Sequence, residues 1–183
     1  MRGWIKFVAA CVVALGLMLV FRAVALTVYT VEGEALSPVL QQGDRVLVNR
    51  WSYGLRIGGE GGLFGYSRLL RRPVSRGDLV VFNDPRTDDG CGSGVLICRC
   101  TALPGDTIRH EGKTVVVPSR SQCADADYYW LEALSGDSPL DSRQFGFVSE
   151  QAIIGRAVLV LYNHHPDSSI VKGWNAHRIL LPL

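Results

Sequence analysis

Cysteines are the residues of this sequence whose type and spacing most directly suggest covalent or metal chemistry. Four of them lie beyond the apolar N-terminal segment: Cys91, Cys98, Cys100 and Cys123. An even number of cysteines in an oxidising compartment favours disulfides. Cys98 and Cys100 are two positions apart in a predicted strand, so their side chains share one face and a bond between them is geometrically unfavourable. The pairing of the four cysteines therefore stays open.

Zinc is the alternative to disulfides, with His110 as a further ligand. The C-x-C spacing differs from that of zinc fingers, however, and we predict neither a metal nor a cofactor. The adjacent His164 and His165 precede Pro166 and Asp167. This composition is typical of a solvated turn rather than of a metal or catalytic site.

The stretch VEGEALSPVL, residues 31–40, has the composition of a loop that presents one reactive side chain. It joins an apolar N-terminal segment to the sequence QQGDRVLVNRWSYG, which alternates as a strand does. Yet Ala35, at the centre of this loop, has no group that could attack a carbonyl or transfer a proton. The elements around the loop must therefore explain what it is for.

The N-terminal segment has the length and composition of a membrane anchor. Residues 7–21 carry no charge, and the chain continues apolar beyond Arg22 to Val31. A helix needs about 20 apolar residues to cross the bilayer core, and an arginine can extend its charged end to the interface. We therefore predict one transmembrane helix within residues 1–27.

The flanking charges set the orientation of this anchor. Arg2 and Lys6 precede the apolar run, which places the N-terminus in the cytoplasm and residues 28–183 outside the cytoplasmic (inner) membrane. Two rivals remain open. The AVA of residues 23–25 is similar to the cleavage site of a secretory signal, and VAAC, ending in Cys11, is similar to a lipoprotein signal.

The rest of the chain has the composition of a strand-and-turn domain. It is 48% hydrophobic, contains 20 Gly and 8 Pro, and has a net charge of only +2, which argues against nucleic-acid binding. The basic cluster RLLRRPVSRGD, residues 68–78, is either a solvated loop or a contact with acidic lipid headgroups.

The elements expected in this domain are mostly strands bounded by Gly, Asp or Pro. Only residues 128–135, YYWLEALS, could form a helix, and it would be short. The glycine-rich loop 57–67 matches no phosphate-binding pattern. We predict a mainly β fold, a folded-over antiparallel domain behind one transmembrane helix. The predicted strands are 44–53, 77–85, 94–108, a hairpin at 108–118, 146–148, 152–163 and 177–183.

Five motifs occur in one order behind the anchor: VEGEALSPVLQQGDRVLVNRWSYGLR, RGDLVVFNDP, CRCTALPGDTI, SPLDSRQFGFVSEQAIIGRA and GWNAHRILLPL. In this order the sequence resembles the type I signal peptidase family of membrane-anchored Ser/Lys endopeptidases, most closely at 31–54, 77–85, 98–108 and 139–156. The resemblance implies a signal-peptidase-like β domain. It also implies that the substrate is a signal peptide of an exported protein, bound extended along a strand edge.

The chemistry of that family needs a serine and a base beside it, because a serine hydroxyl is a poor nucleophile at neutral pH. By resemblance, the base is a lysine whose pKa is lowered by an apolar environment. The family pattern S-M-x-P-T-L falls on ALSPVL, so the nucleophile position is Ala35. The pattern K-R-x-x-x-x-P-G-D falls on CRCTALPGD, so the general-base position is Cys98.

Both members of the implied dyad are therefore replaced. Loss of either member of such a pair costs about 10⁶ in rate, and a cysteine in a desolvated pocket has a raised pKa and is inert. Ser37 is about 6–7 Å further along an extended chain, too far to take over without a register shift that Pro38 opposes. Lys113 belongs to a predicted hairpin turn and has no evident route to the site.

The resemblance implies further site residues. Gly33 matches the oxyanion-side position, and Pro139 stands where the family has a serine that supports the lysine. Four apolar residues match the substrate pockets, or are simply core: Val31, Leu36, Leu40 and Ile97. Near the site, Asp141 and Arg143 match a structural ion pair, and Asp106, after Gly105, matches a turn former.

Three hypotheses follow. The first is a catalytically degenerate signal peptidase I family protein that binds signal peptides or associates with an active relative in the same bilayer. The second is an active serine-type endopeptidase with an unorthodox nucleophile. The third is a structural envelope protein that reuses the fold.

Overall fold

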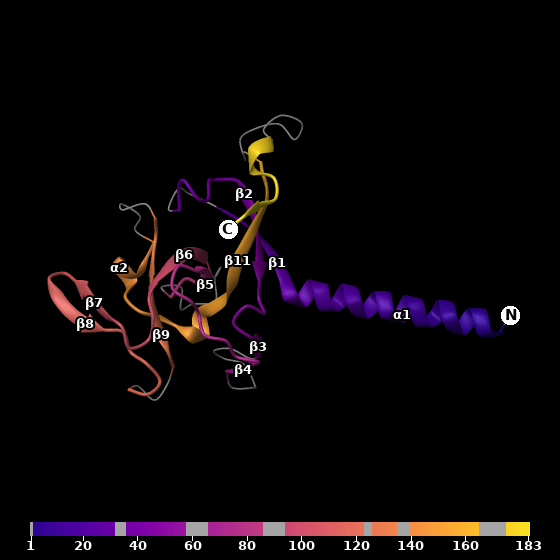
Figure 1. The fold of residues 1–183 in the computed structure, drawn as a ribbon, viewed down its shortest axis with the longest axis horizontal. Helices are drawn as coiled ribbons and strands as arrows, with labels where there is room; N and C mark the ends of the chain where they lie inside the picture. Colours follow the sequence, from indigo (N-terminus) through magenta and orange to yellow (C-terminus); the bar gives the residue numbers. More distant parts are fainter. Residues whose placement is uncertain are drawn as a thin grey trace.

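The computed structural model describes residues 2–31, 36–57, 66–85, 94–122, 126–134, 140–164 and 175–183. A long helix, α1 (Arg2–Ala25), projects from a domain built of strands (Figure 1). The first strand, β1 (Leu26–Thr30), begins directly at the end of this helix. Residues 26–30 therefore form part of the β domain, although their apolar sequence extends the pattern of the helix.

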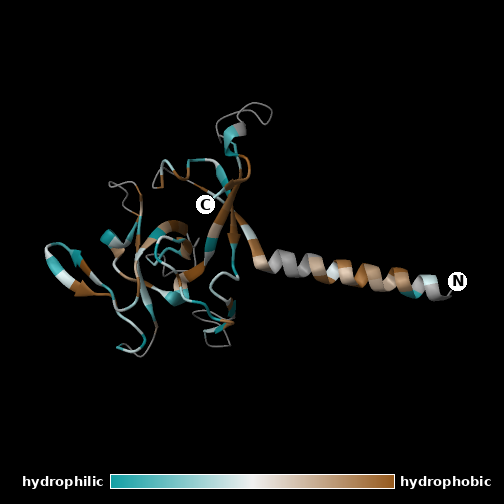
Figure 2. Cartoon of the chain, viewed as in Figure 1, coloured by the Kyte–Doolittle hydropathy of each residue, from teal (hydrophilic) through white to brown (hydrophobic). Residues whose placement is uncertain are grey.

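Helix α1 presents apolar side chains to its surroundings. Trp4, Phe7 and Leu17 are each at least 66% exposed, and the part of the helix that Figure 2 colours is predominantly apolar. None of the helices in the described part of the chain has both the length and the apolarity needed to span a membrane. The anchor expected within residues 1–27 stays a prediction.

One antiparallel sheet organises the domain. Its strands follow the order β1-β2-β11-β5-β6-β9-β10, and β12 pairs with β11 beyond that path. The strands after β1 are β2 (Asp44–Asn49), β5 (Leu79–Asn83), β6 (Val95–Ala102), β9 (Tyr128–Glu132), β10 (Val148–Ser149), β11 (Ile153–Asn163) and β12 (Leu181–Pro182). The mainly antiparallel β domain expected from the sequence is confirmed.

Strand β11 holds this sheet together because it pairs with β2, β5 and β12. Register shifts interrupt its pairing with β2 and β5, as β-bulges do where a strand bends. Gly155 lies where β11 passes close to the end of β2: a Cβ there would lie 2.5 Å from the Asn49 carbonyl oxygen. A side chain at this position would force the two strands apart.

The remaining elements are short. Two two-stranded sheets pair β3 (Leu55–Ile57) with β4 (Ser67–Leu69), and β7 (Thr107–His110) with β8 (Lys113–Val116). The β7–β8 hairpin, expected within 108–118, lies at the end of the domain away from α1 (Figure 1). The helical turns are α2 (Ser142–Phe145), η1 (Glu150–Ala152) and η2 (Ala176–Arg178).

The possible helix within residues 128–135 is not what forms, because residues 128–132 are strand β9 between β6 and β10. Tyr129 and Leu131 enter one buried cluster, whereas Trp130 packs on the other face beside Ala102 and Val117. This alternation is that of a strand buried on both sides, which a short run of aromatic and aliphatic residues does not distinguish from a helix. The central part of the glycine-rich loop 57–67 lies outside the described residues.

Two main clusters form the core on opposite sides of the sheet. One contains Val46, Val48, Val81 and Val160, and the other contains Val80, Phe82, Leu131 and Val148. Val80 and Val81 are adjacent in β5, so this central strand contributes to both clusters. Strand β6 runs between the same two clusters and carries the residues at which the sequence motifs converge.

Candidate functional site

Three of the predicted site residues, Gly33, Ala35 and Pro139, lie outside the described residues. The site is therefore built from the segments that flank them. These are the turn that follows Ala35, the middle of β6, and the beginning of α2.

The four apolar residues matched to substrate pockets come together in one cluster. Val31, Leu36 and Leu40 are 9%, 4% and 0% exposed, and Ile97 of β6 packs against them from the neighbouring strand. The turn is closed by the Leu40 N–H, which donates to the Leu36 carbonyl oxygen at 3.0 Å. The Val31 N–H donates to the Asp44 carbonyl oxygen at 2.8 Å. The structure thus places all four residues in or against the buried core, and their match to substrate pockets stays a prediction.

A buried ion pair holds the far end of this turn. Asp44 is fully buried and accepts hydrogen bonds from Arg178 Nε at 3.0 Å and Arg178 Nη2 at 2.7 Å, one to each carboxylate oxygen. The Gln41 N–H and Asn163 Nδ2 each donate to the same carboxylate at 2.8 Å. Arg178 Nη2 also donates to the Val39 carbonyl oxygen at 2.7 Å. Arg178, near the C-terminus, therefore fixes the turn that follows Ala35.

The sequence motifs do not predict this ion pair. Asp44 and Arg178 are 134 positions apart, and neither occurs in a pattern that predicts a partner. The available signals were weak: an aspartate follows Gly43 at the start of a strand, and an arginine occurs inside the otherwise apolar C-terminal run.

Cys98, at the predicted general-base position, is a free thiol with 1% exposure in the middle of β6. Its Sγ donates to the Leu140 carbonyl oxygen at 3.3 Å, and its apolar surroundings include Val80, Leu131 and Val148. Burial, together with the nearby Asp141 carboxylate, raises the pKa of the Cys98 thiol to about 12. The thiol is therefore protonated at neutral pH and can neither accept a proton nor attack a carbonyl.

Cys100 has the same character two positions along the strand. It is a free thiol, 1% exposed, and burial raises its pKa to about 12. Its Sγ contacts the Ala102 carbonyl oxygen at 3.6 Å. Cys91 and Cys123 lie outside the described residues, so their pairing stays open. His110, considered above as a zinc ligand, packs its ring against Trp130 with 5.1 Å between the ring centroids.

The predicted Asp141–Arg143 ion pair is present beside Cys98. Asp141 is fully buried and caps α2 by accepting a hydrogen bond from the Arg143 N–H at 2.9 Å. It also accepts hydrogen bonds from Arg143 Nε at 2.7 Å and from the Ala133 N–H at 3.2 Å. The adjacent Ser142 Oγ accepts from the Leu131 N–H at 2.9 Å. These contacts attach the start of α2 to the strand next to Cys98.

Asp106 forms the turn that ends the β6 region. Gly105 has a φ of +88°, a left-handed conformation that favours glycine, and Asp106 Oδ2 accepts a hydrogen bond from the Leu103 N–H at 2.6 Å. This bond and the guanidinium of Arg76, 2.6 Å away, lower the pKa of the Asp106 carboxyl. Asp106 thus has the structural role that the resemblance implied.

Ser37 and Lys113, the two residues considered as replacements for the dyad, lie in different parts of the domain. Ser37 is exposed in the turn after Ala35, between the buried Leu36 and the exposed Pro38. Lys113 lies on the β7–β8 hairpin, at the end of the domain opposite α1 (Figure 1). The described part of the site therefore contains a buried apolar cluster, two ordered ion pairs and an inert thiol.

Comparisons with known proteins identify relatives of this sequence. A family model described as "Signal peptidase, peptidase S26" matches residues 4–132. A signal peptidase I of Bacillus caldolyticus is 27% identical over 185 residues, covering 85% of this chain and 87% of that protein. A signal peptidase IB of Staphylococcus aureus strain Mu50 is 26% identical over 133 residues, covering 73% of this chain and 58% of that protein.

Proposed function

We propose a function for this chain on the premise that it belongs to the signal peptidase family, peptidase S26. It is a family member that does not cleave signal peptides. Instead it binds them, or it associates with an active relative. The observation that carries this proposal is the state of Cys98. At the position of the general base, the chain has a buried thiol whose raised pKa keeps it protonated.

The loss of cleavage follows from the chemistry of the two dyad positions. A family peptidase needs a hydroxyl that attacks and an amine that takes its proton. Alanine at position 35 supplies no nucleophile, and the Cys98 thiol already holds its proton at neutral pH. Pro139, at the position of the supporting serine, offers no hydroxyl to a lysine placed at position 98. We infer that all three substitutions act in the same direction.

The binding part of the proposal is supported by the apolar cluster. Val31, Leu36 and Leu40 remain apolar and adjacent, and Ile97 packs against them from β6. Ile97, which is only half-buried, would contact the small apolar residues before the cleavage site of a signal peptide, with the buried Val31, Leu36 and Leu40 packed behind it. The peptide backbone would pair along a strand edge. The same surface would serve a partner chain if the ligand is an active relative.

We also propose that α1 inserts into the cytoplasmic membrane and that the β domain lies outside the cytoplasm. The support is the exposure of apolar side chains, among them Phe7 and Met18, on a 24-residue helix without an acidic residue. Arg2 and Lys6 at the start of the helix favour a cytoplasmic N-terminus. Protease protection of the β domain in inverted and right-side-out vesicles tests this topology.

Cleavage is tested with the full chain purified in detergent and a preprotein substrate. We expect no cleaved product from the unmodified protein. We expect product from the variant with Ala35→Ser and Cys98→Lys, and more when Pro139→Ser restores a supporting hydroxyl. Turnover by the unmodified protein at a rate typical of an active peptidase would overturn the proposal.

Binding is tested separately with a signal peptide that carries a photoreactive group beside its cleavage site. We expect crosslinks to residues 31–40 and 95–98, and none with a scrambled peptide of equal composition. Ile97→Gln should reduce the yield, whereas the control Val116→Gln, on the exposed β8 strand, should not. Absence of specific crosslinks at saturating peptide would favour a structural envelope role.

An active endopeptidase is the second candidate, favoured by one observation: Ser37 is exposed in the turn directly after the nucleophile position. If this serine had taken over, the unmodified protein would cleave the preprotein and Ser37→Ala would abolish the product. Persistence of cleavage in Ser37→Ala would reject Ser37 as the nucleophile.

A further inference from the structure

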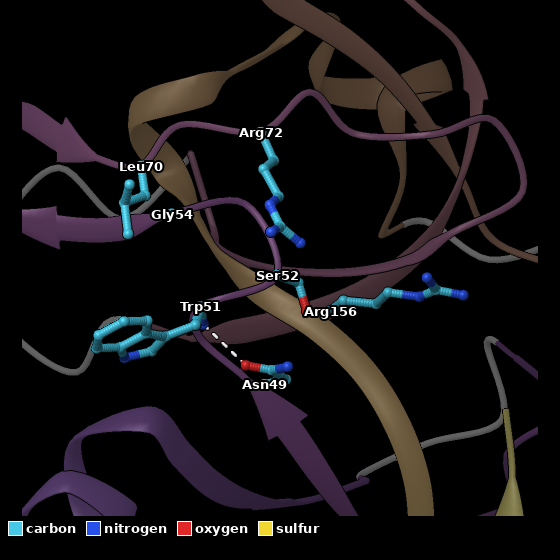
Figure 3. Close-up of a pocket in the computed structure, with 7 residues that line it drawn as sticks. All are labelled: Asn49, Trp51, Ser52, Gly54, Leu70, Arg72 and Arg156. Carbon is cyan, nitrogen blue, oxygen red and sulfur yellow. Dashed lines mark hydrogen bonds between the residues drawn. The ribbon is translucent and has the colours of Figure 1, made fainter.

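A pocket of about 350 Å³ lies away from the candidate cleavage site, between the end of β2 and the segment that follows β4. Figure 3 shows the Arg72 side chain extending from that segment toward Ser52. Asn49 of β2 and Arg156 of β11 contribute further polar groups, and Trp51 and Leu70 contribute apolar surface. None of these residues belongs to the candidate functional site.

Two glycines allow the walls of this pocket to approach each other. Gly54 has a φ of +94°, and a Cβ there would lie 2.7 Å from the Leu69 carbonyl oxygen and 2.9 Å from that of Leu70. The Arg72 N–H donates to the Tyr53 carbonyl oxygen at 3.3 Å across the same approach. Gly155, next to Arg156, permits the contact with Asn49 on the other side. The fold therefore determines the shape of the pocket.

Hydrogen-bond donors dominate the polar lining. Arg72 and Arg156 contribute two guanidinium groups, Ser52 a hydroxyl, and none of the described lining residues is a carboxylate. Asn49 Oδ1 accepts from the Trp51 N–H at 2.9 Å, which leaves its amide nitrogen as the group available to a ligand. Arg156 Nε lies 3.4 Å from Asp78 Oδ1, and the Arg156 side chain is still 46% exposed. The other N–H groups of its guanidinium are therefore accessible to a ligand. Guanidinium groups beside neutral hydrogen-bond donors favour phosphate oxygens as ligands.

The pocket is also next to the point where α1 enters the β domain. Leu26, the first residue after the helix, pairs with Asn49, and the Arg50 N–H donates to the Ala25 carbonyl oxygen at 2.9 Å. Leu69 and Leu70 beside the pocket are 54% and 70% exposed. A ligand that carries both a phosphate and an apolar part matches this combination of donors and exposed leucines.

We propose that this pocket binds a phosphate group, either free phosphate or the phosphodiester headgroup of an anionic lipid. Arg72 contacts the phosphate oxygens, and Ser52 and Asn49 add neutral donors. Arg156, whose guanidinium points away from Arg72 in Figure 3 and pairs with Asp78, adds positive charge at the rim of the pocket. The assignment to a lipid headgroup rests on the proposed insertion of α1, which would place the pocket at the level of the headgroups. The phosphate site itself does not depend on that insertion or on the fate of the cleavage chemistry.

Isothermal titration calorimetry of the full chain in a neutral detergent tests the proposal. The three ligands are inorganic phosphate, dihexanoyl phosphatidylglycerol and dihexanoyl phosphatidylcholine. Saturable binding of phosphatidylglycerol with weaker binding of phosphatidylcholine indicates a headgroup site, and binding of inorganic phosphate of comparable strength indicates a free-anion site. Since no preprotein is present, the result is independent of the cleavage and crosslinking experiments.

Variants make the assignment specific. Arg72→Gln should weaken binding by about tenfold or more, the effect of losing a hydrogen bond to a charged group. The control Arg109→Gln makes the same charge change on the exposed face of β7 and should leave binding unchanged. Ser52→Ala gives a second, smaller change in the pocket that does not alter charge. Equal binding of all three ligands, absence of binding, or an equal loss in Arg72→Gln and Arg109→Gln would overturn the proposal.

Discussion

Two buried aspartates hold the two sides of the candidate site, and they differ in how their charge is compensated. Asp44, below the turn that follows Ala35, is paired with Arg178, whose side chain is only 10% exposed. Asp141, beside Cys98, is paired with Arg143, which is two positions away and 37% exposed. Both carboxylates have no exposed surface.

The two ion pairs also differ in the chain segments that they connect. Arg178 bonds the Asp44 carboxylate and the Val39 carbonyl oxygen, so it connects the C-terminal region to the turn that follows Ala35. Asp141 instead caps its own helical turn and reaches the Ala133 N–H. The first pair is a tertiary contact between distant segments, and the second is mainly local. The nucleophile side of the site therefore depends on long-range packing more than the general-base side does.

The largest expected effect is that of removing Arg178. Arg178→Ala would leave the Asp44 carboxylate buried without its cationic partner, a change that costs about 3–5 kcal/mol. Denaturant unfolding of the detergent-solubilised full chain should show a free energy of unfolding lower by that amount, with an unchanged m-value. Limited proteolysis should also become faster within residues 36–43.

A double-mutant cycle controls this prediction. Asp44→Asn combined with Arg178→Ala removes the uncompensated charge, so the double variant should be less destabilised than the sum of the two single variants. Additive losses would show that the two side chains do not interact in solution. The different ways in which the charges of Asp44 and Asp141 are neutralised would then have no effect on stability.

Asp141→Asn should cost less, about 1.5–3 kcal/mol, because the variant loses charge-assisted hydrogen bonds without leaving a buried charge. Arg143 is more than a third exposed and can be hydrated after its partner is neutralised. The same unfolding experiment measures this loss, with Arg143→Gln as the milder partner variant. A loss for Asp141→Asn as large as that for Arg178→Ala would erase the distinction between a local and a tertiary ion pair.

The same contrast separates what the sequence could predict from what it could not. The Asp141–Arg143 pair lies within one short motif, and Cys98 and Ile97 are adjacent in a β-rich run, so sequence order already placed them together. Asp44 and Arg178 meet only because β11 and the C-terminal residues return to β2, and no local pattern contains that information.

Local ambiguity accounts for the errors in secondary structure. Residues 128–132 are a strand because β6 and β10 flank them, a tertiary context that outweighs short-range preference. Leu26–Thr30 continues the apolar run of α1 but forms strand β1, since pairing with β2 is available from Leu26 onward. Strands β2, β5, β6 and β11 were predictable because β-branched runs bounded by Gly, Asp or Pro are specific signals.

Cys98 gives a pH-dependent test of the general-base side. Its pKa in the folded protein, about 12, exceeds the ordinary value of 9.0, so the unfolded chain releases the thiol proton first as pH rises. Stability is therefore unaffected below pH 9 and falls between about pH 9 and 12, by at most about 1.4 kcal/mol per pH unit for this group.

Comparison with Cys98→Ala isolates that contribution, because the other titrating groups are common to both proteins. The free energy of unfolding of the unmodified protein should fall more steeply from pH 9 to 10, by about 1 kcal/mol. Alkylation mapped by mass spectrometry gives a parallel readout, with the exposed Cys11 modified before Cys98. Equal slopes together with rapid alkylation of Cys98 would show that the thiol is accessible, and the inert state assigned to the general-base position would be wrong.

The smallest effect on stability is expected at a third Asp–Arg pair. This pair is the most exposed of the three and shows what an ion pair contributes without burial. Arg76 and Asp106 are 62% and 32% exposed, and water and salt screen such a pair, so Arg76→Ala should cost between zero and about 1 kcal/mol. The pKa of Asp106 is lowered in the folded state, so this contribution is present at neutral pH and is lost as pH falls through the folded pKa. Unfolding of both proteins at neutral and acid pH, and in high salt, should show the difference shrinking in acid and in salt. If Arg76→Ala instead cost as much as Arg178→Ala, burial would not be what distinguishes the three pairs, and the tertiary role assigned to Arg178 would need another cause.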